Sequence, residues 1–285
     1  IDALHPAAEL FLVGDPEQLA SVDAGTVLAD ISLAAKKEGT DLYRCTERLT
    51  SQYRYAVGSP IEQVVKAVQS GDADQVIDLL RSHRNSEGVV SWIDPSSKAQ
   101  EDLDAFENVG LEVKRHALKV VELAGSSQYE KALEALGQLQ LLCASRVGQL
   151  GIAGWNRTVN KWIGTATRKQ WFVGRPVLIT KNDHGNNLYN GDVGVVCSDK
   201  NGEVRVVFDG LVAPREFPTV RLPEVETVHA LTIHKSQGSE YQHAIVVLPT
   251  GRSRLLTREL LYTGVSRARE QLTIVASESA IRTAV

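Results

Sequence analysis

The spacing of apolar residues changes along the chain and predicts alternating strands and helices. Residues 10–13 and 141–144 are short apolar runs, which are typical of buried parallel strands. Apolar residues with helical spacing lie between these runs, as in Ile61, Val64, Val65 and Val68. Further strands are predicted near the carboxyl end, at residues 228–231, 244–248 and 272–276. The pattern predicts an α/β fold with a parallel sheet.

Capping and termination signals predict where helices begin and end. Ser59 is a suitable cap for a helix whose first turn contains Pro60 and Glu62, and Gly71 is a suitable end for it. Residues 41–55 are predicted to be extended or irregular. The other predicted helices are one after Gly25, most of residues 95–139, and one from Arg258 to about Ala268.

From Phe172 to about Pro223 the apolar pattern changes to a period of two. Short strands are predicted at residues 177–179, 193–196 and 204–208. Tight turns separate them, one at Asn190-Gly191 and one at residues 199–202. Short strands joined by tight turns predict a small β-barrel inserted into the α/β domain.

Composition narrows the class of protein. The chain has 285 residues, of which 43% are hydrophobic and 23% charged, so a packed core is expected. The net charge is −4, so any nucleic-acid binding must come from a local patch. Three scattered cysteines make a zinc site or a disulfide framework unlikely to form. No apolar run approaches membrane-spanning length, and a cytoplasmic protein is expected.

Two segments near the amino end carry candidate chemistry. The segment 14–19 follows a predicted strand, and ligands of open α/β sheets lie at the carboxyl ends of strands. There, Gln18 has an amide that can bond a phosphate or a water, and Asp15 can orient a neighbouring group. Arg54 follows Tyr53 and offers a planar fork for phosphate. Taken alone, residues 14–19 fit a common Gly-Asp-Pro turn better than a ligand site, and Arg54 by itself is uninformative.

The densest chemistry lies near the carboxyl end. Residues 232–241 bring hydroxyls, a cation, an amide, a glycine and a carboxylate together directly after a strand. Gly238 would allow a close approach of the backbone to a ligand. In residues 261–269, Arg267 is predicted to project from a helix and to stabilise charge on a transferring phosphoryl group. A surface arginine without this role is the alternative.

Residues 146–175 contain six cations and no carboxylate, with three tryptophans interleaved. Cations for phosphates and aromatic rings for stacking are what single-strand binding requires. A helix with buried tryptophans and exposed cations explains the pattern equally well.

Four of these segments occur in the order of the superfamily-one helicase motifs. Residues 14–19 resemble motif III, Tyr53-Arg54 resembles motif IV, residues 232–241 resemble motif V and residues 262–268 resemble motif VI. Within this superfamily the chain most resembles RecD-type helicases of the five-prime-to-three-prime branch. The segments that carry this resemblance are residues 18–25, 140–144, 174–177, 189–192 and 234–240. The resemblance covers nearly the whole chain and is weakest at residues 72–135.

The resemblance implies ATP bound between two RecA-like domains. Residues 1–40 would be the tail of the first domain. Residues 41–170 and 224–285 would form the second domain, with the small β-barrel at 171–223 inserted into it. By resemblance, the catalytic residues are Gln18, Arg54 and Arg267. The nucleotide-binding set adds Asp15, Gln237, Gly238 and Glu240, and the DNA-binding set is Thr232, His234, Lys235, Trp155, Arg157 and Lys161.

The implied cofactors are ATP and Mg²⁺ in the full-length parent, with no metal site in this chain. The implied partners are single-stranded DNA and RecB- and RecC-like subunits of an exonuclease V complex, which acts in double-strand-break repair and recombination. No membrane partner is expected.

The chain departs from the family pattern in one respect. The GxxxxGK[ST] phosphate-binding loop and the Asp-Glu pair that holds Mg²⁺ do not occur in the 285 residues. Because the chain starts at Ile1 and contains no methionine, we expect a fragment whose loop lies upstream and which alone does not hydrolyse ATP. The alternatives are a non-catalytic module that binds single-stranded DNA or docks a nuclease partner, and the helicase part of a conjugative relaxase.

Overall fold

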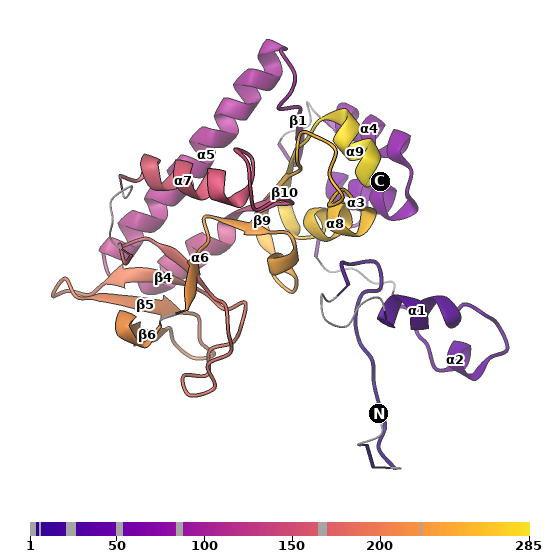
Figure 1. The fold of residues 1–285 in the computed structure, drawn as a ribbon, viewed down its shortest axis with the longest axis horizontal. Coiled ribbons are helices and arrows are strands. Elements are labelled where there is room, and N and C mark those ends of the chain that lie inside the picture. The colour runs from indigo at the N-terminus through magenta and orange to yellow at the C-terminus, as the bar shows by residue number, and fades with distance from the viewer. Residues whose placement is uncertain are drawn as a thin grey trace. The chain divides into compact units, whose positions relative to one another are not determined.

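A computed structural model describes residues 4–5, 7–20, 27–49, 54–83, 88–164, 170–222 and 224–285. The chain divides into two compact units, Ile1–Tyr53 and Arg54–Val285 (Figure 1). Each unit is described by itself. No helix in the described ranges is long and apolar enough to cross a membrane.

The first unit contains two short helices, α1 (Val27–Ala34) and α2 (Asp41–Arg44). Helix α1 confirms the helix expected after Gly25, although Gly25 itself lies outside the described residues. The buried strand predicted at residues 10–13 is wrong, because these residues form no strand and Phe11 is 80% exposed. A strand requires neighbours for its backbone groups, and the described part of this unit contains no strand to pair with it.

The second unit is built on a five-stranded sheet with the order β1-β10-β9-β2-β8. All four neighbouring pairs are parallel. The side chains of Leu141, Ile245 and Ile274 are fully buried, as the apolar runs predicted. The α/β class with a parallel sheet is therefore confirmed. The strands are β1 (Val90–Ile93), β2 (Leu139–Cys143), β8 (Ala230–Thr232), β9 (Tyr241–Val247) and β10 (Ala268–Val275).

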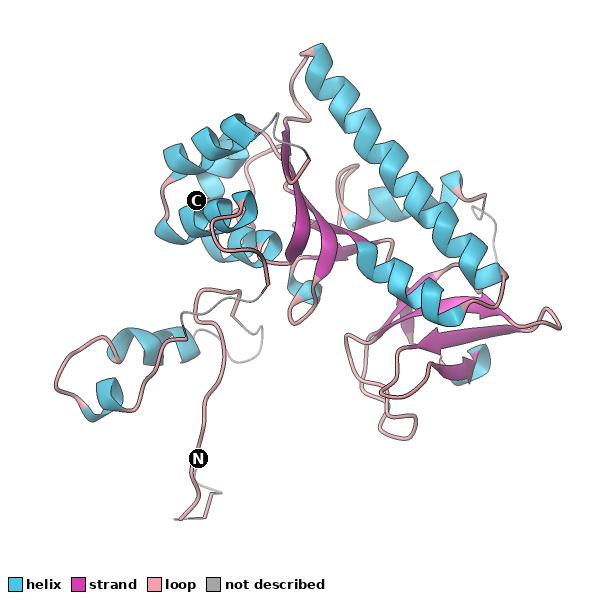
Figure 2. Cartoon of the chain, turned by 180° about the vertical axis from the view of Figure 1, so that it is seen from behind, coloured by secondary structure: helices cyan, strands magenta, loops and turns pink. Residues whose placement is uncertain are grey.

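Helices cover both faces of this sheet (Figure 2). One face carries α3 (Pro60–Ser70), α4 (Ala73–Ser82), α8 (Arg258–Val265) and α9 (Glu278–Ala284). The other face carries α5 (Gln100–Gly125), α6 (Tyr129–Gln138) and α7 (Ile152–Trp162). The predicted cap of α3 is confirmed, since the Ser59 hydroxyl accepts a hydrogen bond from the Glu62 amide at 3.3 Å. Gly71 ends the helix with a φ of 73°.

A second, antiparallel sheet has the order β6-β5-β4-β3-β7. Its strands are β3 (Pro176–Ile179), β4 (Val193–Ser198), β5 (Val204–Phe208), β6 (Arg215–Pro218) and β7 (Val225–Thr227). Strands β6 and β7 are its two edges and do not pair with each other, so among the described residues the sheet is open and the predicted barrel is not confirmed. The hairpin of α5 and α6 joins the sheets, because Val120 and Ala132 pack with Val195 and Val207.

Candidate functional site

Two of the predicted motifs meet at the amino ends of strands β9 and β10. The strands are parallel neighbours, and Tyr241 is in register with Ala268. The residues just before the strands, Glu240 and Arg267, are therefore brought side by side. The Tyr241 amide donates a hydrogen bond to the Arg267 carbonyl at 2.9 Å, which fixes this meeting point.

Arg54 reaches the same point from the segment before α3. Its Nε donates to Glu240 Oε1 at 2.7 Å, and its Nη1 donates to the Ser266 carbonyl at 2.8 Å. The Arg54 side chain is 28% exposed. A second cation, Arg269, lies with its Nε 3.9 Å from Glu240 Oε2. Glu240 is thus the carboxylate that joins two arginines.

Arg267 has a different environment from the one predicted. Helix α8 ends at Val265, and Arg267 lies in the link to β10 with 1% of its surface exposed. The prediction that it projects from a helix is wrong, because the chain enters β10 at Ala268 and carries this side chain into the protein. Burial, followed by the charge of Arg54, lowers the pKa of the Arg267 guanidinium.

Every nitrogen of the Arg267 guanidinium is engaged inside the protein. Its Nε donates to the Thr263 carbonyl at 3.0 Å, and its Nη1 donates to the Ser239 carbonyl at 3.1 Å. Its Nη2 donates to the Ser266 hydroxyl at 3.1 Å. Three arginines therefore lie near one carboxylate, Glu240, which contacts Arg54 and Arg269, whereas the Arg267 guanidinium bonds to other residues. The excess positive charge suits an anion such as phosphate.

The predicted residues of the first unit also lie together. The Gln18 side-chain amide donates to Asp15 Oδ2 at 2.9 Å, and the Glu17 amide donates to Asp15 Oδ1 at 3.1 Å. Asp15 thus orients Gln18, as a turn of this kind allows. Because each unit is described by itself, Gln18 is not placed relative to Arg54 or Arg267. Tyr53 and residues 21–25 of the RecD-like phrase lie outside the described residues.

The candidate DNA-binding residues follow strand β8, at the opposite end of the parallel sheet. The Thr232 hydroxyl accepts a hydrogen bond from the Lys235 amide at 3.1 Å and holds the short helix η3 (His234–Ser236). The Lys235 ammonium lies 2.6 Å from Glu226 Oε2. Partial burial, followed by the charge of Arg146, lowers the pKa of His234. Thr232 pairs with Cys143, so β2 and β8 end at the same edge.

The segment from η3 to β9 contains the remaining nucleotide-binding candidates, Gln237 and Gly238, and both are exposed. Gly238 has a φ of 81°, a left-handed conformation that favours glycine, and its position would leave open space around a side chain. The backbone conformation therefore favours glycine here, and the close approach of this backbone to a ligand stays a prediction.

The cations and aromatic rings of residues 146–175 differ in their burial. Arg157 and Lys161 are exposed on α7, whereas Trp155 is 5% exposed and packs in the core. The Trp155 and Phe106 ring centroids lie 6.2 Å apart, and with 5% of its surface exposed the Trp155 ring is not open to a base in this structure, so its stacking role stays a prediction. Arg175 is also buried and donates to Thr227 Oγ1 at 2.8 Å. Arg168 and Lys169 lie outside the described residues.

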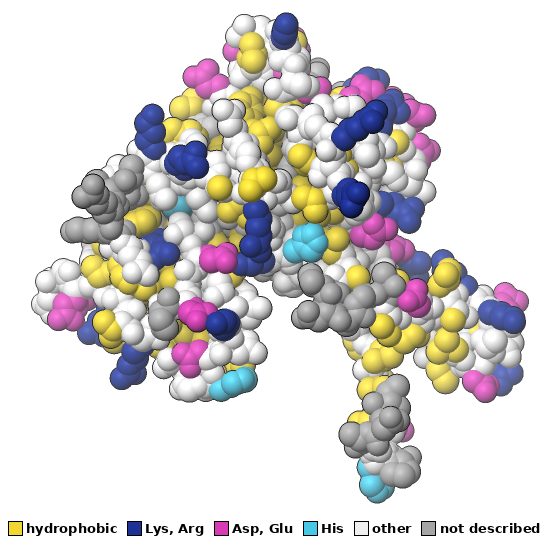
Figure 3. Space-filling view, viewed as in Figure 1, with side chains coloured by type: hydrophobic (Ala, Val, Ile, Leu, Met, Phe, Trp, Pro, Cys, Tyr) yellow, Lys and Arg dark blue, Asp and Glu magenta, His cyan; other side chains and the backbone are white. Residues whose placement is uncertain are grey.

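Nucleic-acid binding by this chain would require a local basic patch, and that patch stays a prediction. On the face shown in Figure 3, the Lys and Arg side chains are dispersed among Asp and Glu and do not form a continuous stripe. Among the described residues, no group of three or more His, Cys, Asp or Glu side chains is arranged to hold a metal ion.

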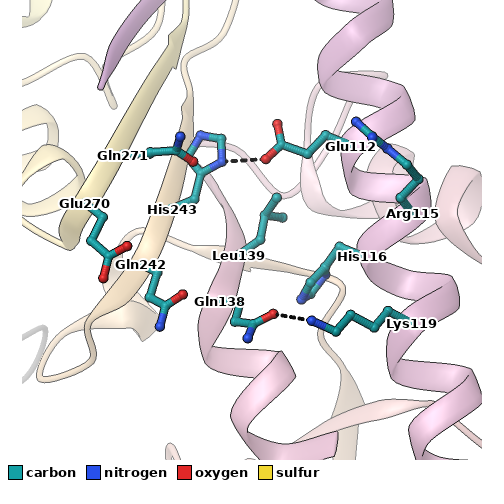
Figure 4. A pocket seen from close by; sticks show the side chains of 10 residues that line it. All are labelled: Glu112, Arg115, His116, Lys119, Gln138, Leu139, Gln242, His243, Glu270 and Gln271. Carbon is teal, nitrogen blue, oxygen red and sulfur yellow. Dashed lines mark hydrogen bonds and ion pairs between the residues drawn. The ribbon is translucent and has the colours of Figure 1, made fainter. Parts of the chain in front are cut away.

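A polar cavity of about 430 Å³ lies between α5 and the amino ends of β2, β9 and β10 (Figure 4). His243 on β9 contacts both α5 and β10. Its Nδ1 lies 2.9 Å from Glu112 Oε1 on α5, and its Nε2 lies 2.9 Å from Thr273 Oγ1 on β10. The bond to His243 holds the pKa of Glu112 below its usual value. No sequence pattern predicted this cavity, because its residues come from five elements and form no motif.

Comparisons with known proteins agree with the motifs. Residues 227–275 match the family described as the UvrD-like helicase C-terminal domain, and residues 2–94 match an AAA domain. The chain is 40% identical over 288 aligned residues to "RecBCD enzyme subunit RecD" of Mycobacterium tuberculosis. That alignment covers 100% of this chain and 47% of the relative. The chain belongs to the RecD family.

Other RecD-type relatives show the same partial coverage. The RecD subunit of Haemophilus influenzae is 32% identical, with 100% of this chain and 49% of the relative covered. "ATP-dependent RecD2 DNA helicase" of Deinococcus radiodurans is 30% identical, with 98% of this chain and 34% of the relative covered. The chain therefore spans about half, or less, of the curated RecD-type proteins it matches.

A Bacteroides Pif1 helicase, solved in complex with ADP-AlF3 and single-stranded DNA, is also similar in structure. The TM-score is 0.48 at 15% sequence identity, covering 95% of this chain and 63% of that one. At this distance the likeness assigns no role to any residue.

Proposed function

We propose that this RecD-type chain is the motor portion of an ATP-dependent DNA helicase. In the full-length parent it would couple ATP hydrolysis to five-prime-to-three-prime translocation on single-stranded DNA during double-strand-break repair and recombination. The observation that carries the proposal is the meeting of Arg54, Glu240 and Arg267 at the amino ends of β9 and β10. The excess of guanidinium groups there fits the phosphates of a nucleotide.

In this proposal the candidate residues have three different roles. Gln18, oriented by Asp15, would sense the γ-phosphate from the first unit. Arg54 and Arg267 would stabilise the charge on the transferring phosphoryl group, while Gln237, Gly238 and Glu240 belong to the network around the nucleotide. Thr232, His234 and Lys235 would contact the DNA backbone, with Arg157 and Lys161 as exposed phosphate partners.

ATP and Mg²⁺ would be held chiefly by residues that this chain does not contain. Its 285 residues include no GxxxxGK[ST] loop, and the described residues offer no carboxylate cluster suited to the metal. An arginine finger accelerates phosphoryl transfer about 10³- to 10⁵-fold, but only on a nucleotide that is already bound. The chain alone is therefore proposed to lack ATPase activity and tight nucleotide binding.

The proposed partners are single-stranded DNA and RecB- and RecC-like subunits. The Mycobacterium tuberculosis relative is named a subunit of the RecBCD enzyme, whereas the Deinococcus relative is named a helicase in its own right. The missing phosphate loop favours a second candidate, a non-catalytic module that binds single-stranded DNA. The conjugative-relaxase alternative has no observation in its favour.

DNA-stimulated ATP hydrolysis by the full-length parent tests the role of Arg54. We expect Arg54→Ala to lower kcat by at least about 100-fold, because the guanidinium acts on the transferring phosphoryl group. The matched control is Glu278→Gln on α9, which removes a surface charge that pairs with Arg81 and Arg282. Its kcat should equal that of the wild type. A normal kcat in Arg54→Ala would refute the assignment.

A further inference from the structure

Arg54 is held through two of its three guanidinium nitrogens. Its Nε donates to Glu240 Oε1 and its Nη1 donates to the Ser266 carbonyl, whereas Nη2 has no hydrogen-bond partner among the described residues. Arginine is a long side chain with about 2 kcal/mol of rotamer entropy, so two fixed contacts are needed to hold it in one direction. The two contacts leave Nη2 available for an anion.

We propose that Glu240 is a positioning residue, which acts in ATP hydrolysis by aiming Arg54 rather than by touching the nucleotide. The inference rests on the proposed function and assigns a single task to one member of its nucleotide network. At 2.7 Å the contact between Arg54 Nε and Glu240 Oε1 has the length of a charge-assisted hydrogen bond.

The position of Ser266 explains why a carboxylate is needed at residue 240. The Ser266 carbonyl accepts from Arg54, and its hydroxyl accepts from Arg267, so the two guanidinium groups share one residue. Two cations at such close quarters repel each other. Glu240 offsets this repulsion, and without it Arg54, the more exposed of the two, is the one free to turn away.

The direction of Arg267 is already fixed by the protein and does not depend on Glu240. Its three nitrogens are bonded to Thr263, Ser239 and Ser266, and 1% of its surface is exposed. Arg54 keeps one nitrogen, Nη2, without a partner among the described residues, and its side chain is 28% exposed. Of the two, Arg54 is therefore the one whose direction can be set by a neighbour.

A double-mutant cycle in the full-length parent tests the positioning role. Glu240→Ala should lower kcat for DNA-stimulated ATP hydrolysis about 10- to 100-fold, the value of a hydrogen bond to a charged group, and leave the KM for ATP within about twofold. Glu240→Gln should lose less, since its amide oxygen still accepts from Arg54. In an Arg54→Ala background, Glu240→Ala should cause no further loss.

Either of two outcomes would overturn the positioning role. One is an equal loss of kcat from Glu240→Ala with and without Arg54, and the other is a change confined to the KM for ATP, which indicates direct nucleotide contact. Glu278→Gln is the control, because Glu278 is 35% exposed and Glu240 37%, and each lies beside two arginines. Circular dichroism of each variant verifies that it is folded.

A second measurement needs no catalytic activity. In the 285-residue chain, the Arg54 Nε–H proton should give a resolved NMR signal protected from solvent exchange in the wild type and in Glu278→Gln, and should lose that protection in Glu240→Ala. Unchanged protection in Glu240→Ala would contradict the inference. If the parent shows no DNA-stimulated ATPase, the proposed function fails, while this measurement still decides whether Glu240 holds Arg54.

Discussion

Arg54 and Arg267 show how neighbouring residues give one side-chain type two environments. Both were candidates from sequence because arginine offers a planar fork for phosphate. Their burial could not be predicted, since it depends on where α8 ends and β10 begins. Trp155 is a similar case: its residue type suits stacking, but its position on the inner face of α7 places it in the core.

The difference in burial predicts a difference in stability between two conservative variants. Arg267→Lys should lower the free energy of unfolding of the chain by about 2–4 kcal/mol, because one ammonium cannot serve the three buried acceptors. Arg54→Lys should cost about 1 kcal/mol or less, because the ion pair is partly exposed. Urea unfolding measures both, and equal losses would contradict the assigned burial.

His229 predicts a pH dependence of stability. Burial, followed by the charges of His116 and Arg175, lowers the pKa of His229 to about 3. Below the ordinary histidine value near 6.5, the unfolded chain binds a proton that the folded chain does not, so stability falls as pH falls toward 3. Between pH 7 and pH 5 the free energy of unfolding should therefore fall by about 1–2 kcal/mol less in His229→Gln than in the wild type.

The comparison is made by urea unfolding at both pH values. His184→Gln is the control, because its ring is exposed and it should keep the wild-type pH dependence. If His229→Gln loses stability between pH 7 and pH 5 as steeply as the wild type, the buried neutral state of His229 is wrong.

Among the elements, the helices with clear start and stop signals were predictable and the unpaired strand was not. Helix α3 has a capping serine, a first-turn proline and a terminal glycine, which all act within a few residues. A strand depends on distant partners, and residues 10–13 lack them in the described part of their unit. The partners of β2, β9 and β10 are present, and the apolar pattern predicted the bounds of these strands to within a few residues.

The end of α3 gives a prediction at the level of an element. Gly71→Ala should destabilise the chain by about 1 kcal/mol or more, because φ is 73° and the added methyl would lie 3.0 Å from Arg258 Nη1. Gly137→Ala, in α6 with open space around it, should be neutral or stabilise by up to about 1 kcal/mol. Thermal or urea unfolding compares them, and effects of the same sign would contradict the assigned helix end.

At the scale of the whole molecule, the sequence predicted the two kinds of sheet but not how each is completed. Strands and turns of the antiparallel sheet were visible from their period, whereas closure into a barrel requires pairing of β6 with β7, which no local pattern encodes. Motif order predicted that Arg54, Glu240 and Arg267 belong to one site. The residues that line the polar cavity around His243 belong to no motif, so the sequence did not predict the cavity. The domain bounds 1–40, 41–170 with 224–285, and 171–223 stay predictions.

The central claim is that this chain supplies part of an ATP-driven motor and depends on a phosphate-binding loop outside its 285 residues. The most direct test is ATP hydrolysis with and without single-stranded DNA, by the chain itself and by a version extended to include the parent's GxxxxGK[ST] loop. We predict that only the extended version hydrolyses ATP and that DNA stimulates it. Hydrolysis by the 285-residue chain alone would contradict the account.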